Sequence, residues 1–248
     1  QRNGDYYEYL TDEEKDVEQE IKNTEVETSD VAAELEKLVF EYVIKSRKIR
    51  DADNNQDYAY SRKLDDKLHG REYELAINVI SPFHESVGDE TTVRMQNMGR
   101  NILLVIMPPD DRLVRDLLMY KRTEKYIRQN ISVTQQEAIR RILTEKGFHN
   151  RERYSELQER VRDLISRAKL LVAENEMDIS PGDPQSRIFR GFHELITRAY
   201  PHLRMLRGHT YGENDVGEIL NQSGKGLFAS DAASLPESEQ EVLSHIQG

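Results

Sequence analysis

Ile102-Leu-Leu-Val-Ile-Met107 is a continuous apolar run that Pro108 and Pro109 close, and it is the clearest strand in the sequence. A strand that is apolar on both faces is typical of a central position in a sheet that is covered on both sides. Proline cannot donate to a strand ladder, so the strand must end at this pair. From Asp110 onward the spacing of apolar residues becomes helical, which predicts a sheet followed by a helical region.

The residues before this strand predict a helical pair and further strands. Thr11 and Glu14 form a capping box at the start of the first helix, and Asp30 is expected to cap the second. The β-rich segments 41–50 and 56–64 flank a turn signal at residues 53–55 and predict a hairpin. Residues 72–80 are another strand candidate. We therefore expect a small mixed sheet within residues 40–107.

The residues after this strand predict a helical hairpin. A second capping box, Thr134 to Glu137, begins a helix that Gly147 is expected to end. A heptad seam follows, and an intramolecular hairpin against residues 111–146 explains it more simply than a free coiled-coil dimer. The members of the seam are Tyr154, Leu157, Val161, Leu164, Ala168 and Leu171. Residues 174–183 are expected to form a polar loop, and Asp183-Pro184 to begin a helix that Pro201 closes.

These patterns predict an α+β fold that is predominantly helical. Its expected divisions are a helical pair with a small mixed sheet at 1–109, and a helical hairpin and bundle at 110–222, whose last helix spans 214–222. A Gly/Ser/Ala-rich linker follows at 223–235, and residues 236–248 are expected to begin a truncated further domain.

Composition excludes several classes of site. The chain of 248 residues has no Cys, which rules out a disulfide framework, a Cys nucleophile and thiolate zinc sites. It has no signal-peptide pattern and no apolar run near the roughly 20 residues that span a bilayer. We therefore expect a cytoplasmic protein with no membrane partner. Because the first residue is Gln1 and not Met, we expect a processed chain or a piece of a longer one.

No catalytic, cofactor or metal site is predicted. Ser223-Gly-Lys-Gly226 resembles part of a phosphate-binding loop, but Ile219 and Gly226 stand where that loop needs Gly and Ser or Thr. His193-Glu194 begins like a zinc-protease helix, but Thr197 replaces the second His, so His193 is expected to be a partly buried packing residue. We expect this chain not to be an enzyme.

Charge is distributed unevenly along the chain. The net charge is −11, yet residues 94–170 contain 17 basic and 10 acidic residues, a balance of +7. Such a segment can track phosphates, dock on a protein partner or a second copy, or simply be a solvated or internally paired helix surface, and the sequence leaves all three open. The candidate residues for a DNA or partner surface are Arg112, Arg115, Lys121, Arg122, Lys125, Arg128, Arg140 and Arg141.

Several longer stretches resemble one known family. They are YLTDEEKDV at 9–17 with EIKNT at 20–24, GREYEL at 70–75, and the segment 107–130, which begins MPPDDRL and ends YKRTEKYIRQN. Together they resemble an internal region of the P-loop ATPase of bacteriophage exclusion (BREX) systems, the BrxC/PglY family. The resemblance covers residues 6–207 and continues more weakly into 235–246, which look like the opening helix of a winged-helix module.

The resemblance implies a part of an anti-phage defence ATPase that acts with a DNA methyltransferase and other BREX proteins. It implies ATP and Mg²⁺ for the parent protein, with the nucleotide site outside this chain, because the family's Walker motifs have no matching positions here. On this basis we expect a non-catalytic fragment that links the ATPase core to later domains and mediates assembly, DNA contact or both. The alternative is a stand-alone coiled-coil-hairpin module for protein interaction or regulation that does not bind DNA.

Overall fold

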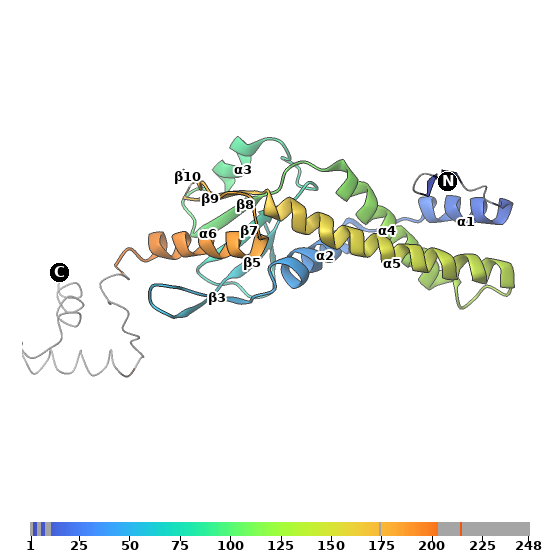
Figure 1. Ribbon diagram of the computed structural model, residues 1–248, viewed down its shortest axis with the longest axis horizontal. Coiled ribbons are helices and arrows are strands. Elements are labelled where there is room, and N and C mark those ends of the chain that lie inside the picture. The colour runs from blue at the N-terminus through green and yellow to red at the C-terminus, as the bar shows by residue number, and fades with distance from the viewer. Residues whose placement is uncertain (1, 4–5, 8–10, 174, 203–213, 215–248) are drawn as a thin grey trace, which may run out of the picture.

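The computed structural model describes residues 2–3, 6–7, 11–173, 175–202 and 214, and it places a six-stranded sheet at the base of a long helical arm (Figure 1). The strands of the sheet are β5 (Ser61–Leu64), β6 (Lys67–His69), β7 (Ala76–Ile80), β8 (Ile102–Ile106), β9 (Lys169–Val172) and β10 (Asn175–Glu176). Two short antiparallel pairs lie outside it: β1 (Arg2–Asn3) with β2 (Tyr6–Tyr7), and β3 (Lys48–Arg50) with β4 (Asp57–Ala59). The α+β class and the small mixed sheet are confirmed.

The sheet has the strand order β10-β9-β8-β7-β5-β6. The adjacent strands β8, β7 and β5 run parallel, while β6, β9 and β10 pair with their neighbours in antiparallel fashion. The tight turn between β5 and β6 places Asp65 and Asp66 at positive φ, a conformation that Asp tolerates better than most residues.

Strand β8 is central and buried on both faces, as its apolar run predicts. On one face Leu103 and Val105 join the main hydrophobic core. On the other face Leu104 packs in a smaller cluster with Val93 of the short helix α3 (Glu90–Gln96). Alternate residues of one strand therefore serve two cores, which is why the strand contains no polar residue.

Helix α6 (Pro184–Ala199) covers the main-core face of the sheet. It begins as predicted, because the Asp183 carboxylate accepts a hydrogen bond from the backbone N–H of Ser186 and Pro184 occupies the first turn. The helix lies very close to β8, since a Cβ added to Gly191 would stand 2.8 Å from Cδ1 of Leu103. Glycine at this position is what allows the helix backbone to approach the strand.

A buried arginine joins α6 to the end of the arm. The Arg187 guanidinium donates to the carbonyl oxygens of Ile165, Ser166, Ala168 and Ile179, at distances of 2.7–3.2 Å. Burial lowers the pKa of Arg187. These carbonyls include the last ones of a helix, where partial negative charge accumulates and favours a cation. Arg187 therefore holds the helix end, β9 and the following loop together.

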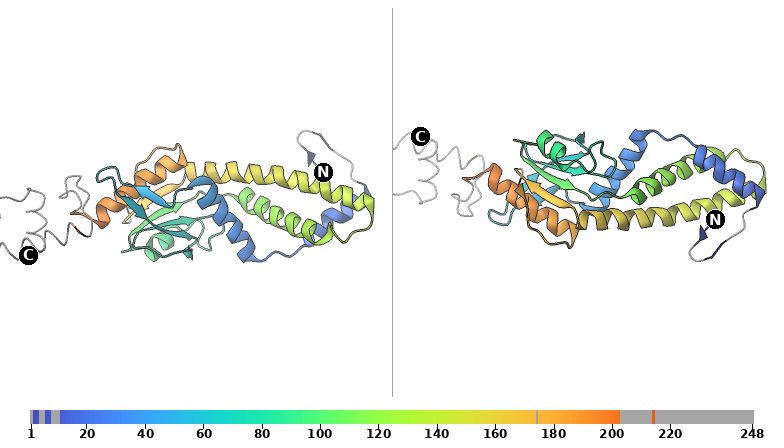
Figure 2. Two further views of the ribbon diagram at one scale, coloured as in Figure 1. Left: turned by 90° about the horizontal axis from the view of Figure 1, so that it is seen from below. Right: turned by 90° about the horizontal axis from the view of Figure 1, so that it is seen from above.

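The arm is the helical hairpin α4 (Asp111–Asn130) and α5 (Glu137–Ser166), and it projects away from the sheet (Figure 2). Helix α5 has 30 residues and is therefore about 45 Å long. Helix α1 (Asp12–Asn23) packs near the distal end, where Val17 and Ile21 contact Ile142 and Leu143. Helix α2 (Thr28–Lys37) packs nearer the sheet. The capping box of Thr11 and Glu14 is confirmed.

The predicted strand at residues 41–50 is largely wrong. Helix α2 continues directly into a π-helical turn, η1 (Leu38–Val43), in which the N–H of Ile44 donates to the carbonyl of Val39 over 2.9 Å. Phe40, Val43 and Ile44 are buried in the core. Side chains that favour strands are thus buried here from a helical backbone, without strand pairing. Of the predicted hairpin, only the short strands β3 and β4 pair with each other. Residues 61–64 form β5, which pairs in the main sheet.

Three predicted helix boundaries are also wrong. Gly147 does not end a helix but lies inside α5, and Thr134 is no cap because α5 begins at Glu137 after Gln136. Asp30 lies in the first turn of α2, whose N-cap is Glu27. The expected polar loop at 174–183 contains part of a hairpin, since β9 and β10 extend the sheet beyond the expected residues 40–107.

The heptad seam is buried within the chain. Leu157, Val161 and Leu164 of α5 belong to the main core, whereas Leu171 lies in β9 on the opposite face of the sheet. The expected helix at 214–222, the linker at 223–235 and the further domain at 236–248 lie outside the described residues, Asn214 excepted. No helix in the described part of the chain is long and apolar enough to cross a bilayer.

Candidate interaction surface of the helical arm

The eight predicted basic residues all lie on the arm, but they do not form one surface. Six are on α4 and two are at the start of α5. They differ in how far they are exposed and in whether groups of the same chain already bind them. These differences decide which of them can meet a partner.

Four of the eight are held by groups of the same chain: Arg112, Lys121, Lys125 and Arg140. Arg112 donates to Asp116 over 3.2 Å and to Glu156 over 3.5 Å. The Lys121 ammonium lies 3.1 Å from the Glu34 carboxylate and 2.6 Å from that of Glu124. The Lys125 ammonium donates to the backbone carbonyl of residue 25 over 2.8 Å. The acidic N-terminal helices therefore dock on the basic α4 of their own chain.

Lys121 is the most strongly held of these cations. Its side chain is 15% exposed and that of Glu34 is 7% exposed, so the pair is largely shielded from water. Burial alone would lower the pKa of Lys121, but the carboxylates of Glu124 and Glu34 outweigh it and raise this pKa. Burial and the charge of Glu124 also raise the pKa of the neighbouring Tyr120 to about 12. Lys121 thus stabilises the junction of α2 and α4 and is not available to a ligand.

Arg122 is half-buried, and its Nε atom is buried with no hydrogen-bond partner among the described residues. Arg115, Arg128, Arg140 and Arg141 are exposed. Arg140 donates to the carbonyl of Thr134 over 2.8 Å, which stabilises the loop between the two helices. Three exposed cations, Arg128, Arg140 and Arg141, therefore flank the loop at the distal end of the arm.

Apolar side chains accompany these cations, which sequence reasoning missed. Ile131 is 38% exposed, Val133 is 68% exposed and Phe148 is 53% exposed. The Arg151 guanidinium lies 5.7 Å from the centre of the Phe148 ring. The available signal was the pair of β-branched residues in a loop between two helices, where polar residues are usual. We call Arg128, Ile131, Val133, Arg140 and Arg141 the distal tip.

Two polar clusters elsewhere satisfy themselves internally. Asp66 and His84, after β5 and β7, lie 3.0 Å apart, and Asn78 donates to Asp66 over 2.7 Å. His193 does more than pack, because its Nδ1 lies 2.5 Å from the buried Asp51 carboxylate. Within the described residues no three His, Asp or Glu side chains are grouped so as to hold a metal ion.

The family of the chain follows from its sequence and its sheet together. Residues 24–195 match the family model described as the BREX ATP-binding protein BrxC 4th domain with six-stranded beta sheet. The chain belongs to the BREX BrxC family. The matched range contains all six strands of the observed sheet, so the fold agrees with the description of this BrxC domain. No solved structure matches the chain.

The match confirms, over residues 24–195, the expected resemblance to an internal region of BrxC/PglY proteins and supports a role in BREX defence. The matched range of the BrxC domain includes all eight basic candidates as well as the complete arm. The arm is therefore part of this domain of the family and not an addition to it.

Proposed function

We propose that this BrxC domain is a non-catalytic assembly module whose helical arm contacts DNA, a protein partner or both through its distal tip. In this proposal it links the ATPase core of the family protein to later domains. ATP and Mg²⁺ are assigned to a site outside this chain. The observation that carries the proposal is the tip itself, where three arginines and two apolar side chains are exposed at the end of an arm that projects from the sheet.

DNA contact is supported by the charge of the tip. Arg128, Arg140 and Arg141 are exposed, and the helices provide only Glu137 as an acid between them. A cation that neutralises a phosphate releases condensed counterions, so binding through the tip would weaken as salt increases. Arg112 and Lys121 would add little, because carboxylates of the same chain already neutralise them.

A DNA-binding measurement with a matched control tests this idea. The variant Arg128→Glu/Arg140→Glu/Arg141→Glu changes the net charge by the same amount as Arg47→Glu/Arg71→Glu/Arg100→Glu, whose three arginines are exposed on the sheet end of the molecule. For wild type we expect log Kd against log salt to change by about 0.9 for each phosphate contacted. The tip variant should lose up to three such contacts, whereas the control variant should lose none. Equal effects of the two triple variants would exclude tip-directed DNA binding.

Protein contact is the second candidate function, and the apolar side chains of the tip favour it. Exposed apolar groups beside arginines are typical of the centres of protein interfaces. The partners would be other BREX proteins, including the DNA methyltransferase, or a second copy of this chain. In the latter case the arm would act as an interaction module without any DNA.

Light scattering after size exclusion tests self-association. If the tip joins two copies, wild type should form dimers at high concentration and Val133→Ser/Ile131→Ser should remain monomeric. Leu68→Ser, which changes an exposed apolar residue of the sheet edge strand β6, is the control and should behave as wild type. A strict monomer at all concentrations would exclude self-association and leave the other BREX proteins as the proposed partners.

A further inference from the structure

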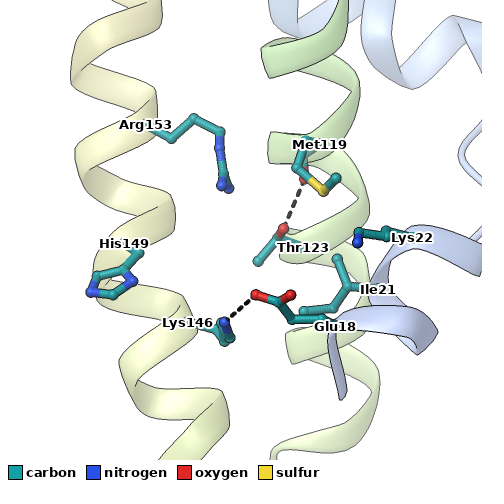
Figure 3. A pocket seen from close by; sticks show the side chains of 8 residues that line it. All are labelled: Glu18, Ile21, Lys22, Met119, Thr123, Lys146, His149 and Arg153. Carbon is teal, nitrogen blue, oxygen red and sulfur yellow. Dashed lines mark hydrogen bonds and ion pairs between the residues drawn. The ribbon is translucent and has the colours of Figure 1, made fainter. Parts of the chain in front are cut away.

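A pocket of about 200 Å³ lies on the arm between α1, α4 and α5 (Figure 3). Lys22 contributes to it from α1, while Lys146 and Arg153 contribute from α5. Glu18 is the single carboxylate in its lining, so these four side chains carry a net charge of +2. Ile21 and Met119 provide apolar wall, and none of the tip residues takes part.

Arg153 is the decisive side chain of this pocket. It extends from α5 into the space in front of α4 (Figure 3), and its Nη1 donates to Oδ1 of Asn150 over 2.7 Å. Among the described residues no carboxylate lies within 4.0 Å of its guanidinium, although other arginines of the arm have such partners. Burial lowers the pKa of Arg153, but a guanidinium keeps its proton at ordinary pH. The carboxylates of Asp116, Glu156 and Glu18 offset part of this burial cost from beyond ion-pair distance, and an anion in direct contact with the guanidinium would offset more of it.

Two further cations, Lys146 and Lys22, line the same pocket. The Lys146 ammonium lies 2.8 Å from the Glu18 carboxylate, which holds it at the wall of the pocket. The charge of Glu18 also acts on Arg153, and the net charge of +2 already includes it. The ammonium of Lys22 is directed toward α4 (Figure 3). Planar guanidinium and ammonium donors together are the usual ligands of phosphate groups.

From these observations we infer that the pocket between α1, α4 and α5 binds a phosphate group, with Arg153 as its main ligand and Lys22 and Lys146 as its flanking cations. The pocket is smaller than the roughly 300–1,000 Å³ of sites that enclose whole drug-sized ligands. It therefore suits a phosphate head group, either free or at the end of a larger molecule. Because the pocket joins α1 to both helices of the arm, the bound anion would fasten α1 in place.

Calorimetric titration of the chain with inorganic phosphate, at constant ionic strength maintained with chloride, tests the inference. We expect saturable binding to wild type and a loss of at least about tenfold in affinity for Arg153→Gln, the effect of removing a charged hydrogen-bonding group. Lys22→Gln should also weaken binding, and since Lys22 is exposed, this variant keeps the test valid if Arg153→Gln does not fold. Arg151→Gln, an exposed arginine of the same helix, is the control and should bind as wild type.

The outcomes are decisive in either direction. No phosphate binding beyond that of chloride, or equal binding by wild type, Arg153→Gln and Lys22→Gln, would overturn the inference. Competition by a short 5′-phosphorylated oligonucleotide, but not by its 5′-hydroxyl counterpart, would identify a nucleic-acid end as the source of the phosphate. Binding of inorganic phosphate without such competition would identify a free phosphate as the ligand. The tip-variant experiment does not alter this pocket, so the two proposals can fail separately.

Discussion

Replacing either of two helix-interior glycines with alanine should change the free energy of unfolding, in opposite directions at the two positions. Gly147 lies in α5 and Gly191 lies in α6, so each replacement gains about 0.8–1.0 kcal/mol of helix propensity. At Gly147 the nearest atom to an added Cβ is Cδ1 of Ile127, 3.8 Å away, which is an ordinary contact. We therefore expect Gly147→Ala to increase the free energy of unfolding by about 1 kcal/mol.

At Gly191 the added methyl meets the core. Cδ1 and Cδ2 of Leu103 would lie 2.8 Å and 3.2 Å from it, and Leu103 is fully buried in the central strand. Overpacking of this kind costs about 1–3 kcal/mol, which exceeds or equals the gain in propensity. Gly191→Ala should therefore lower the free energy of unfolding by up to about 2 kcal/mol.

Urea unfolding measures both effects, as a shift in midpoint with an unchanged slope. The variant Leu103→Val shortens the side chain that the new methyl would strike. In this background Gly191→Ala should cost less, and a double-mutant cycle gives the coupling between the two positions. A Gly191→Ala protein as stable as Gly147→Ala, or a cycle with no coupling, would refute the close approach of α6 to β8.

Three further predictions concern the joints of the fold. Arg187→Met should lower the free energy of unfolding in urea by about 3–5 kcal/mol, because four buried carbonyls lose their charged donor. Asp183→Ala should cost about 1 kcal/mol at pH 7. Hydrogen bonds from Ser186 lower the pKa of Asp183, so this contribution is present above the ordinary pKa of an aspartate and is lost as the pH falls through the lowered one, where wild type and variant should converge. Ile21→Ala should abolish hydrogen-exchange protection in α1 while the amides of β8 remain protected, and unchanged protection of α1 would contradict its docking through Ile21.

Features with a local physical cause could be predicted from the sequence. Strand β8 was predictable because Ile102–Ile106 is apolar at every position, which only a strand between two cores requires. The start of α6 was predictable because Asp183 and Pro184 act within a single turn. The capping box at Thr11 is equally local.

Features that depend on tertiary packing could not be predicted. Phe40 and Val43 have the side chains of a strand, but their helix lies between the arm and the sheet and buries them on several sides. Gly147 looked like a helix end because nothing in its neighbourhood reveals that α5 continues to Ser166. The strand β9 was missed because its partner β8 lies more than 60 residues earlier.

The candidate site shows the same limit. The sequence identified a basic segment, yet the internal pairing of Lys121 with Glu34 depends on how α2 crosses α4. Arg153 was part of the basic pattern but carried no special signal, because its burial arises only when α1 closes over the two helices. Charge density was therefore predictable, whereas the distribution of free and engaged cations was not.

The pairing of β8 with β9 has a consequence for how the arm can move. Helix α4 follows β8 and helix α5 precedes β9, so both ends of the arm are attached to adjacent strands of one sheet. A rotation of these two strands would therefore turn the whole arm about its attachment to the core. With α5 about 45 Å long, a rotation of one degree at this attachment displaces the far end by about 0.8 Å. A small twist of the sheet would therefore move the distal tip further than it moves the strands themselves.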